Sequence, residues 1–285
     1  MQNSETSNRW GVGVLLLVIV LPLMIGSALS LLIPQPIIGV IYLNDAIYDF
    51  SARQMIAQID YARQTPAVRA VVIVMNSPGG TVVDTESVYM ELARLRQTKP
   101  VITIIEGMAA SGGYYLSCGT DYIFAKPSSV VGNIGVIGYA PQSPMAIEDV
   151  YSSGPYKLWG SSRDSTMREV EMLKRGFLQV VQLGRGSRLA IPDEVILSGQ
   201  VWSGVEARQL GLVDEFGPQS SAFEKAAQLA RVSHYRTVDL STQVQMPEAP
   251  GVFFMQAPNG TLTPYPNKEG IYLLYVPQTE KEVLP

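Results

Sequence analysis

The stretch AVVIVMNSPGG, residues 70–80, is an uninterrupted apolar run that ends in a turn motif rich in Pro and Gly. Its apolar residues do not alternate with polar ones, which is typical of a strand that a parallel sheet covers on both faces. Similar runs, Ile37–Leu43 before it and Val101–Ile105 after it, recur about every 30 residues. This spacing is typical of β-α units with parallel strands and helical crossovers, and it predicts an α/β fold.

Amphipathic segments separate the apolar runs, and no clean domain boundary interrupts the series. A strand is also expected within Ile271–Val276, in the Pro- and Gly-rich tail, to which we assign no function. We expect helices over Ala52–Gln64, over Val82–Gln97, over a short segment starting near Ser111, and over Met167–Leu183 with Thr166 and Glu169 as a capping box.

The composition excludes several kinds of site. The chain has 21 Lys+Arg and 25 Asp+Glu, a net charge of −4, and no basic block, so we expect no nucleic-acid partner. Cys118 is the only cysteine and His234 the only histidine. This excludes an internal disulfide, a multi-cysteine metal site and a multi-histidine metal centre, and we expect neither a metal nor a cofactor.

No charged residue lies between Arg9 and Asp45. Within this gap, Gly11–Leu32 as a helix would reach ~33 Å, enough to cross a hydrocarbon core of ~30 Å. We therefore predict a cytoplasmic segment 1–10, a transmembrane anchor over 11–34, an extracytoplasmic domain over 35–242 and a C-terminal extension over 243–285. A cleaved signal peptide is the alternative, but its apolar region of about 7–15 residues is usually shorter.

Two turns that follow predicted strands have residues suited to catalysis. The glycine pair at the end of Asn76–Gly80 allows backbone N–H groups to approach a ligand and to stabilise an oxyanion. Ser111, within Gly107–Tyr115, lies at the expected N-terminus of a helix, where the helix dipole favours an alkoxide. Taken singly, an ordinary turn and a serine N-cap are the simpler interpretations.

A nucleophilic Ser111 needs a base. His234 has no partner motif, and a surface or capping histidine is its simpler interpretation. A lysine is the known substitute, and Lys157 lies in a loop between two bulky aromatic residues. Such surroundings would lower the pKa of the ammonium group from about 10.4. Lys126 is the rival base by proximity in sequence, and a solvated surface lysine is the alternative interpretation of Lys157.

Seven motifs occur in order over roughly residues 36–232. They are NSPGG (76–80), KPV (99–101), AASGGYY (109–115), VGNIGV (131–136), YK (156–157), GRG (184–186), and SGQVWSG (198–204) leading to Ala207 and LGLVD (210–214). Each motif is short, but the ordered set resembles the signal peptide peptidase A (protease IV) family in its half-length, membrane-anchored form. The resemblance implies a Clp protease/crotonase-like fold of repeated ββα units.

The resemblance also implies roles for individual residues. Ser111 would be the nucleophile and Lys157 the general base, while the N–H groups of Gly80 and Gly112 would form an oxyanion hole. Asn133 stands where the family usually has a serine that supports the lysine, and an asparagine carbonyl can accept from an ammonium group. The expected substrates are apolar peptides such as remnant signal peptides, and the expected assembly is a homo-oligomeric ring in which neighbouring subunits contribute Ser111 and Lys157.

Two other functions fit the same fold. A crotonase-like acyl-CoA enzyme would use the same paired N–H groups together with carboxylates, and Glu106 is the only acidic residue close to the Ser111 motif. A catalytically weak or inactive scaffold is the second alternative, which Asn133 keeps open. The function we expect is that of a membrane-anchored serine endopeptidase with a Ser/Lys dyad.

Overall fold

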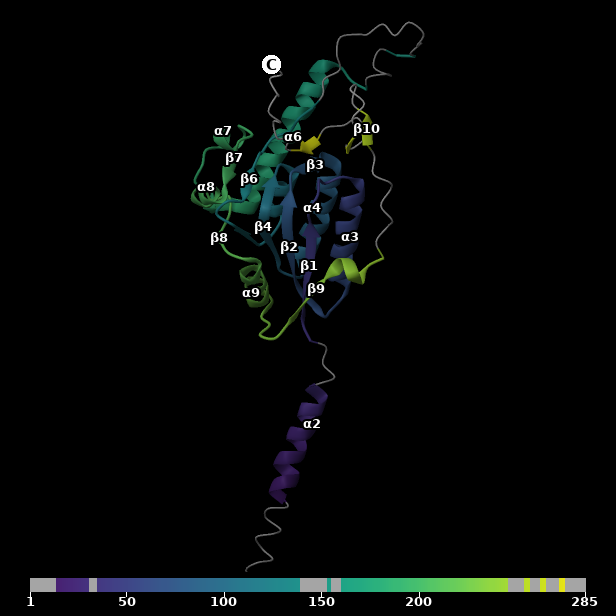
Figure 1. Ribbon diagram of the computed structural model, residues 1–285, viewed down its shortest axis with the longest axis vertical. Coiled ribbons are helices and arrows are strands. Elements are labelled where there is room, and N and C mark those ends of the chain that lie inside the picture. The colour runs from purple at the N-terminus through teal and green to yellow at the C-terminus, as the bar shows by residue number, and fades with distance from the viewer. Residues whose placement is uncertain are drawn as a thin grey trace, which may run out of the picture. The chain divides into compact units, whose positions relative to one another are not determined.

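The structure of the chain is a computed structural model that describes residues 14–30, 35–138, 153–154 and 160–245, together with the short segments 254–256, 262–264 and 272–274. The chain divides into two units, Met1–Pro36 and Ile37–Pro285. Figure 1 shows both units and labels most of their helices and strands.

The first unit is helical and apolar. A π-helical segment, Leu16–Val20, is followed by α2 (Leu21–Ser30), and side chains such as Leu17 and Leu23 are 66% and 68% exposed. No helix in the described part of the chain combines the length and hydropathy that a membrane crossing requires. Residues 11–13 and 31–34 lie outside the described residues. The structure therefore does not bear out a spanning helix over 11–34, and the anchor stays a prediction.

The second unit is built on a sheet that contains eight strands within the described residues. The main path runs β7-β6-β4-β2-β1-β9, and β5 and β8 continue beside β4. Every pair is parallel except β6 with β7, which is antiparallel. The strands are β1 (Ile37–Leu43), β2 (Val68–Ser77), β4 (Val101–Ala110), β5 (Tyr122–Ala125), β6 (Val130–Gly132), β7 (Val201–Ser203), β8 (Glu215–Phe216) and β9 (Arg236–Asp239).

Helices connect the parallel strands, as the sequence predicted. They are α3 (Asp49–Gln64), α4 (Val82–Arg96), α5 (Gly112–Cys118), α6 (Arg163–Arg185), α7 (Asp193–Ile196), α8 (Gly204–Gln209) and α9 (Gln219–Ala230), with 3₁₀ turns η2 (Gly186–Arg188) and η3 (Leu240–Gln243).

Helix α6 begins earlier than predicted. Its N-cap is Ser162, whose hydroxyl accepts the N–H of Ser165 at 3.2 Å. Thr166 instead lies inside the first turns, where its hydroxyl bonds the carbonyl of Ser162. The capping box predicted at Thr166 and Glu169 is therefore wrong, because a better-placed serine lies four residues upstream.

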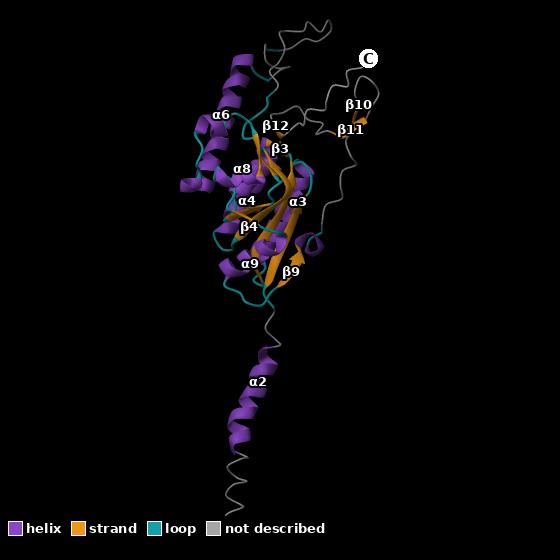
Figure 2. Cartoon of the chain, turned by 60° about the vertical axis from the view of Figure 1, so that its left-hand side comes forward, coloured by secondary structure: helices purple, strands orange, loops and turns teal. Residues whose placement is uncertain are grey.

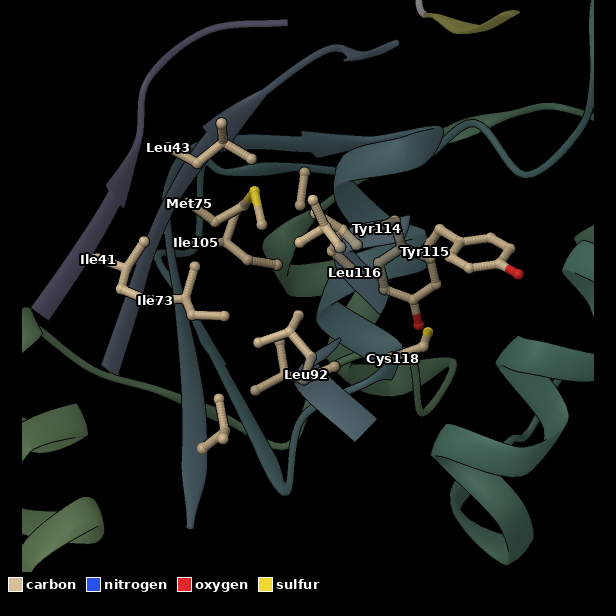
Figure 3. Packing of buried hydrophobic residues seen from close by; sticks show 14 of the residues in the cluster. Ile41, Leu43, Ile73, Met75, Leu92, Ile105, Tyr114, Tyr115, Leu116 and Cys118 are labelled. Atoms are coloured by element: carbon tan, nitrogen blue, oxygen red, sulfur yellow. The ribbon is translucent and has the colours of Figure 1, made fainter. Parts of the chain in front are cut away.

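The sheet is covered on both faces, which explains why its strands show no polar alternation. In β2, Ala70, Val72 and Val74 face a cluster that includes alanines of α9. The residues between them, such as Val71 and Ile73, face a larger cluster with α3, α4 and α5. Figure 3 shows part of this larger cluster, in which side chains of β1, β2 and β4 meet Leu92 and the aromatic residues of α5.

Polar side chains secure the amino end of the sheet, where the parallel strands begin. Asp121 accepts the N–H of Val101, the first residue of β4, at 2.8 Å. Asp214 accepts the N–H of Ile123 in β5 at 2.8 Å and is paired with Arg185. The Arg185 and Asp214 side chains are only 1% and 6% exposed, so this pair belongs to the packed interior.

Four short strands lie outside the main sheet. β10 (Phe254–Gln256) pairs antiparallel with β11 (Leu262–Pro264). β12 (Tyr272–Leu274) pairs antiparallel with β3 (Gly79–Thr81), which follows β2 directly. The strand predicted within Ile271–Val276 is thus present, and it lies on a turn that the sequence marked as a candidate site.

Candidate active site

The turn after β2 holds its backbone in a crowded position. Gly79 has a φ of 100°, a conformation that glycine adopts without a Cβ penalty. A Cβ added to Gly80 would lie 1.7 Å from the carbonyl oxygen of Ile47. The N–H of Ile47 donates to the Gly79 carbonyl at 2.8 Å, and the N–H of Thr81 donates to the Ile47 carbonyl at 2.9 Å. The positive φ therefore favours glycine at position 79, and close backbone packing requires glycine at position 80.

Gly80 directs its own N–H group away from Ile47. Successive residues of a strand present their N–H and C=O groups to opposite sides. The carbonyl of Gly79 and the N–H of Thr81 both bond Ile47, so the N–H of Gly80 faces the other side of β3. This donor is thereby available to a partner outside the loop.

Ser111 follows the last residue of β4 at the N-cap position of α5, yet its side chain makes no capping hydrogen bond. The simpler interpretation as a serine N-cap is therefore wrong. Its backbone has a φ of 52° and a ψ of −122°, a conformation that costs about 1–3 kcal/mol in a residue other than glycine. Its N–H donates to the carbonyl of Gly132 at 2.8 Å. Such strain at a polar residue is characteristic of functional sites.

The turns after β2 and β4 meet because the two strands are parallel neighbours, with Ser77 opposite Ala109. A Cβ added to Gly112 would lie 2.8 Å from the Oγ1 atom of Thr85 and 3.3 Å from the backbone nitrogen of Gly80. The structure thus brings Gly80 and Gly112 together, directly beside Ser111.

This arrangement places a serine hydroxyl close to the backbone N–H groups of two glycines, and these are two of the three kinds of group that acyl transfer requires. A serine hydroxyl that is not used as a cap can attack a carbonyl carbon once a base removes its proton. Converging backbone N–H groups stabilise the negative charge that then develops on the carbonyl oxygen. The remaining part is the base.

His234 does not lie near Ser111. It is exposed and precedes β9, whose first residue, Arg236, pairs with Ile37 at the start of β1. Because β1, β2 and β4 are parallel, His234 lies at the amino end of the sheet and Ser111 at the carboxyl end. A Ser-His-Asp triad through this histidine is excluded.

Lys99 has a lowered pKa but the wrong position. Burial, reinforced by the charge of Arg69, lowers the pKa of its ammonium group. The ammonium group donates to the carbonyls of Ala62 and Thr65, and so caps the end of α3. Lys99 precedes β4, whose ten residues extend roughly 33 Å before Ser111 is reached.

Lys126, the rival base, forms an ion pair with Glu106. Glu106 is the carboxylate that the acyl-CoA alternative would need for acid/base chemistry, and this ion pair already engages it. The other lysines in the described part of the chain also have partners: Lys174 pairs with Glu171, and Lys225 lies 4.3 Å from the centroid of the Tyr122 ring. Lys157 lies outside the described residues, so its position relative to Ser111 stays a prediction.

Neither a metal centre nor a second nucleophile is evident at this site. Over the described ranges, no group of three His, Cys, Asp or Glu side chains could hold a metal ion. Cys118 is buried at the far end of α5, and burial raises its pKa to about 12. Its thiol therefore stays protonated and unreactive.

Two family models match the segments that form this site. The Clp protease model matches residues 37–131, and the peptidase family S49 model matches residues 93–233, with Ser111 inside both. The chain belongs to peptidase family S49. Its sheet, mixed through the antiparallel β6–β7 pair and covered by helices on both faces, is the Clp protease-like α/β fold.

Several relatives carry protease names. Protease 4 of Salmonella typhi is 34% identical over 218 residues, which cover 70% of this chain and 35% of that protein. A putative protease of Methanocaldococcus jannaschii is 34% identical over 66% of this chain and 65% of its own length. The putative signal peptide peptidase SppA of Enterococcus faecium is 28% identical over 61% of this chain and 55% of its own length. The chain thus spans between about a third and two thirds of the length of these relatives.

Asn133 departs from the serine expected in the S49 family, and its backbone offers a reason. Its φ is 52°, in the left-handed region that asparagine tolerates better than most residues. Its Nδ2 group donates to the carbonyl of Gly199 at 2.7 Å, and its backbone N–H donates to the carbonyl of Gln200 at 2.8 Å. The side-chain oxygen keeps its capacity to accept from an ammonium group, and Asn133 directly follows Gly132, whose carbonyl accepts the N–H of Ser111.

Sequence reasoning missed two parts of the candidate site. Ile47, which fixes β3 in place, is an ordinary apolar residue of a loop and has no recognisable motif. The strand β12 was expected as a strand, but its pairing with β3 was not. Contacts between such distant segments leave no local signal in a single sequence.

Proposed function

We propose that the chain is a serine endopeptidase with Ser111 as nucleophile and Lys157 as general base. The observation that supports this most is the strained, uncapped Ser111 beside the converging glycines Gly80 and Gly112. The S49 match and the protease names of the relatives favour the same chemistry.

The chemistry proceeds in balanced steps. The neutral amine of Lys157 takes the proton of the Ser111 hydroxyl as Oγ attacks the peptide carbonyl carbon. The N–H groups of Gly80 and Gly112 stabilise the resulting oxyanion. The protonated lysine then donates to the leaving nitrogen as the C–N bond breaks, and water hydrolyses the acyl-enzyme.

Lysine is the base that fits the described residues best. His234 lies at the opposite end of the sheet, and the four described lysines are engaged elsewhere. Asn133 follows the residue that bonds Ser111, so its side-chain carbonyl is suited to orient an ammonium group there. We propose that Asn133 supports Lys157 in this way.

The substrates we propose are apolar peptides such as remnants of signal peptides. We further propose that residues 11–34 anchor the chain in the cell membrane with its folded unit outside the cytoplasm, and that neighbouring subunits of a ring share Ser111 and Lys157. Removal of residues 1–34 should then release the protein from sedimenting lipid vesicles. Continued sedimentation of the shortened protein would argue against the anchor.

Peptide hydrolysis tests the proposed dyad. Wild-type protein should cleave a fluorogenic apolar peptide and react covalently at Ser111 with a serine-directed probe. Ser111→Ala and Lys157→Ala should both be inactive, whereas Lys126→Ala, which removes the rival lysine, should keep its activity. A folded wild-type protein that neither cleaves nor labels would favour the scaffold instead.

Mixing the two inactive variants tests whether subunits share the site. Ser111→Ala and Lys157→Ala chains, refolded together, should regain part of the wild-type activity, because some interfaces would combine an intact serine with an intact lysine. A mixture as inactive as each variant alone would contradict shared sites but leave the dyad itself intact.

A further inference from the structure

Thr85 is a polar residue buried where the turns after β2 and β4 meet. It lies near the start of α4 and is 0% exposed, whereas the buried residues that follow it in this helix, Val88, Leu92 and Leu95, are apolar. Figure 2 shows β3, which precedes α4, at the carboxyl end of the sheet, the upper end in that view. Because burial of a hydroxyl costs free energy unless the hydroxyl is hydrogen-bonded, an apolar residue would be the simpler choice at this position.

The Thr85 hydroxyl holds the end of β3. It donates to the carbonyl of Thr81 at 2.7 Å, and Thr81 is both the last residue of β3 and the N-cap of α4. A bond from a threonine hydroxyl to the carbonyl four residues earlier is common in helices. This bond explains how the buried hydroxyl is satisfied, but by itself it assigns Thr85 no role outside α4.

A second contact joins Thr85 to the turn after β4. A Cβ added to Gly112 would lie 2.8 Å from the Oγ1 atom of Thr85. The same point lies 3.3 Å from the backbone nitrogen of Gly80. One side chain is therefore bonded to the residue after Gly80 and lies against Gly112, so it connects the two turns that carry the candidate oxyanion donors.

The size of the hydroxyl group matters at this contact. Two carbon atoms pack at about 3.5–4.0 Å, so a methyl group in place of the oxygen would require more room beside Gly112. The methyl group would also lose the bond to the Thr81 carbonyl. Replacement of the hydroxyl would thus release the end of β3 and change the spacing between Gly80 and Gly112.

We propose that Thr85 is a positioning residue for the oxyanion hole and fixes the spacing between the N–H groups of Gly80 and Gly112. It holds Gly80 through the carbonyl of the next residue and sets how closely Gly112 approaches. The inference rests on the proposed function for the use of these N–H groups, whereas the spacing rests on the contacts of Thr85 itself. Thr85 acts on the reaction only through the two glycines.

A change in this spacing affects the rate rather than substrate binding. Donors stabilise an oxyanion when they lie about 2.7–3.1 Å from it, and loss of one entire donor lowers kcat about 10²–10³-fold. A displacement of a few tenths of an ångström should cost less, about tenfold. An interaction made only in the transition state lowers kcat and kcat/KM equally, so KM stays unchanged.

Three substitutions in the full-length chain test the role of Thr85. Thr85→Val removes the hydroxyl at nearly constant volume and should lower kcat for a fluorogenic apolar peptide about tenfold, with KM unchanged. Thr85→Ser keeps the hydroxyl and should retain kcat within about twofold. Thr85→Ala removes the hydroxyl without crowding Gly112, so it should lower kcat about threefold and replaces Thr85→Val if the valine impairs folding.

Ser87→Ala is the matched control in the same helix. The Ser87 hydroxyl makes the same kind of bond, to the Val83 carbonyl at 2.7 Å, but Ser87 is partly exposed. Ser87→Ala should therefore keep the kcat and KM of wild type. An equal loss of kcat in Ser87→Ala, or a loss in Thr85→Val that Thr85→Ser shares, would overturn the inference.

Crystal structures of the variants give a readout that needs no turnover. The distance between the backbone nitrogens of Gly80 and Gly112 should differ from wild type by a few tenths of an ångström in Thr85→Val, and it should be unchanged in Thr85→Ser. If the distance changes but the wild-type protein cleaves no peptide, Thr85 does set the spacing and the peptidase proposal fails. If the wild-type protein cleaves peptides but either the distance or kcat of Thr85→Val matches wild type, the inference is wrong and the peptidase proposal stands.

Discussion

The two ends of the parallel sheet use their polar residues in opposite ways. At the amino end, the Asp121 and Asp214 carboxylates accept backbone N–H groups and pair with arginines. At the carboxyl end, Ser111 makes no capping bond and its backbone is strained. Polar groups that have all their partners stabilise a fold, whereas a polar group held in strain without a partner is suited to chemistry.

This comparison predicts that substitutions at the two ends have separable effects. Changes at the amino end should lower the free energy of unfolding and leave the activity of folded molecules intact. Changes at the carboxyl end should lower kcat/KM by more than their effect on stability explains.

The largest effect is expected for Ser111→Ala. Loss of the nucleophile should lower kcat/KM for an apolar peptide roughly 10⁴-fold or more, with little change in Tm because the hydroxyl caps nothing. Ser117→Ala, in the same helix, removes a hydroxyl that bonds the Gly113 carbonyl at 2.8 Å. The Ser117→Ala control should have a lower Tm and an unchanged kcat/KM. A loss of activity in Ser117→Ala, with a loss of stability in Ser111→Ala, would contradict the different roles of the two serines.

The next largest effect is expected at the amino end, for Asp214→Ala. This variant leaves the buried Arg185 guanidinium without its carboxylate, which should cost about 3–5 kcal/mol of stability. Urea unfolding measures the loss, and peptide hydrolysis by the folded fraction at low temperature should match wild type. A drop in kcat/KM without a drop in stability would show that the amino end also takes part in the reaction.

The pH dependence of stability tests the same ion pair. Burial alone would raise the pKa of Asp214, but the hydrogen bonds and charge of Arg185 outweigh burial and lower it. A lowered folded-state pKa adds stability above the unfolded-state value of about 3.9, and this stability is lost as pH falls through the folded-state pKa. Wild type should therefore lose stability below about pH 4, and Asp214→Asn should lack this part of the loss. If the stability of wild type and of Asp214→Asn fell equally with decreasing pH, the stabilising role of the Asp214–Arg185 pair would be wrong.

A smaller but selective effect is expected for Gly80→Ala. Its Cβ would lie 1.7 Å from the Ile47 carbonyl, so β3 must move and carry the N–H donor away. We expect kcat/KM to fall about 10²–10³-fold and stability to fall by about 1–3 kcal/mol. Gly176→Ala, where a Cβ meets nothing within 4 Å, is the matched control and should keep both its kcat/KM and its stability. Equal activity of the two variants would exclude Gly80 as a donor.

The smallest effect is expected at Asn133. Both Asn133→Ala and Asn133→Gly remove the amide carbonyl, and both should lower kcat/KM about tenfold, equivalent to about 1.4 kcal/mol. They should differ in stability by about 1 kcal/mol in favour of glycine, because the φ of 52° strains alanine. Both should also shift the acid limb of the pH–rate profile, where protonation of the base abolishes activity, if Asn133 tunes the lysine. If kcat/KM of the two variants instead changed in parallel with their stability, the role of Asn133 would be structural only.

Local pattern predicted the elements better than it predicted their ends. Ile37–Leu43 matches β1 at both ends, since an unbroken apolar run marks a strand with two covered faces. β4 continues to Ala110, five residues beyond the predicted end at Ile105. Glu106 and Gly107 interrupt the apolar run, but pairing of Met108–Ala110 with β6 extends the strand. That extension depends on a distant partner and has no local signal.

The candidate site was predictable in its residues but not in its geometry. Glycine pairs after strands and a serine before a helix are visible in sequence and pointed to Ser111 and the turn at 76–80, while the family resemblance singled out Gly80 and Gly112. The conformation of Ser111, the contact of Gly80 with Ile47 and the position of β12 were not visible. The order of β1, β2 and β4 in the sheet also decided that His234 lies at the wrong end.

The sequence by itself determined the period of the apolar runs, the positions of the glycine pairs, and the presence of a single histidine and a single cysteine, which limits the candidate bases. Such features depend on single residues and their near neighbours. Only the tertiary structure decided that two turns meet at one end of the sheet, which lysines are already paired, and that a C-terminal strand lies against β3. These outcomes depend on strand register and on backbone contacts between segments far apart in the chain, and local sequence patterns carry neither.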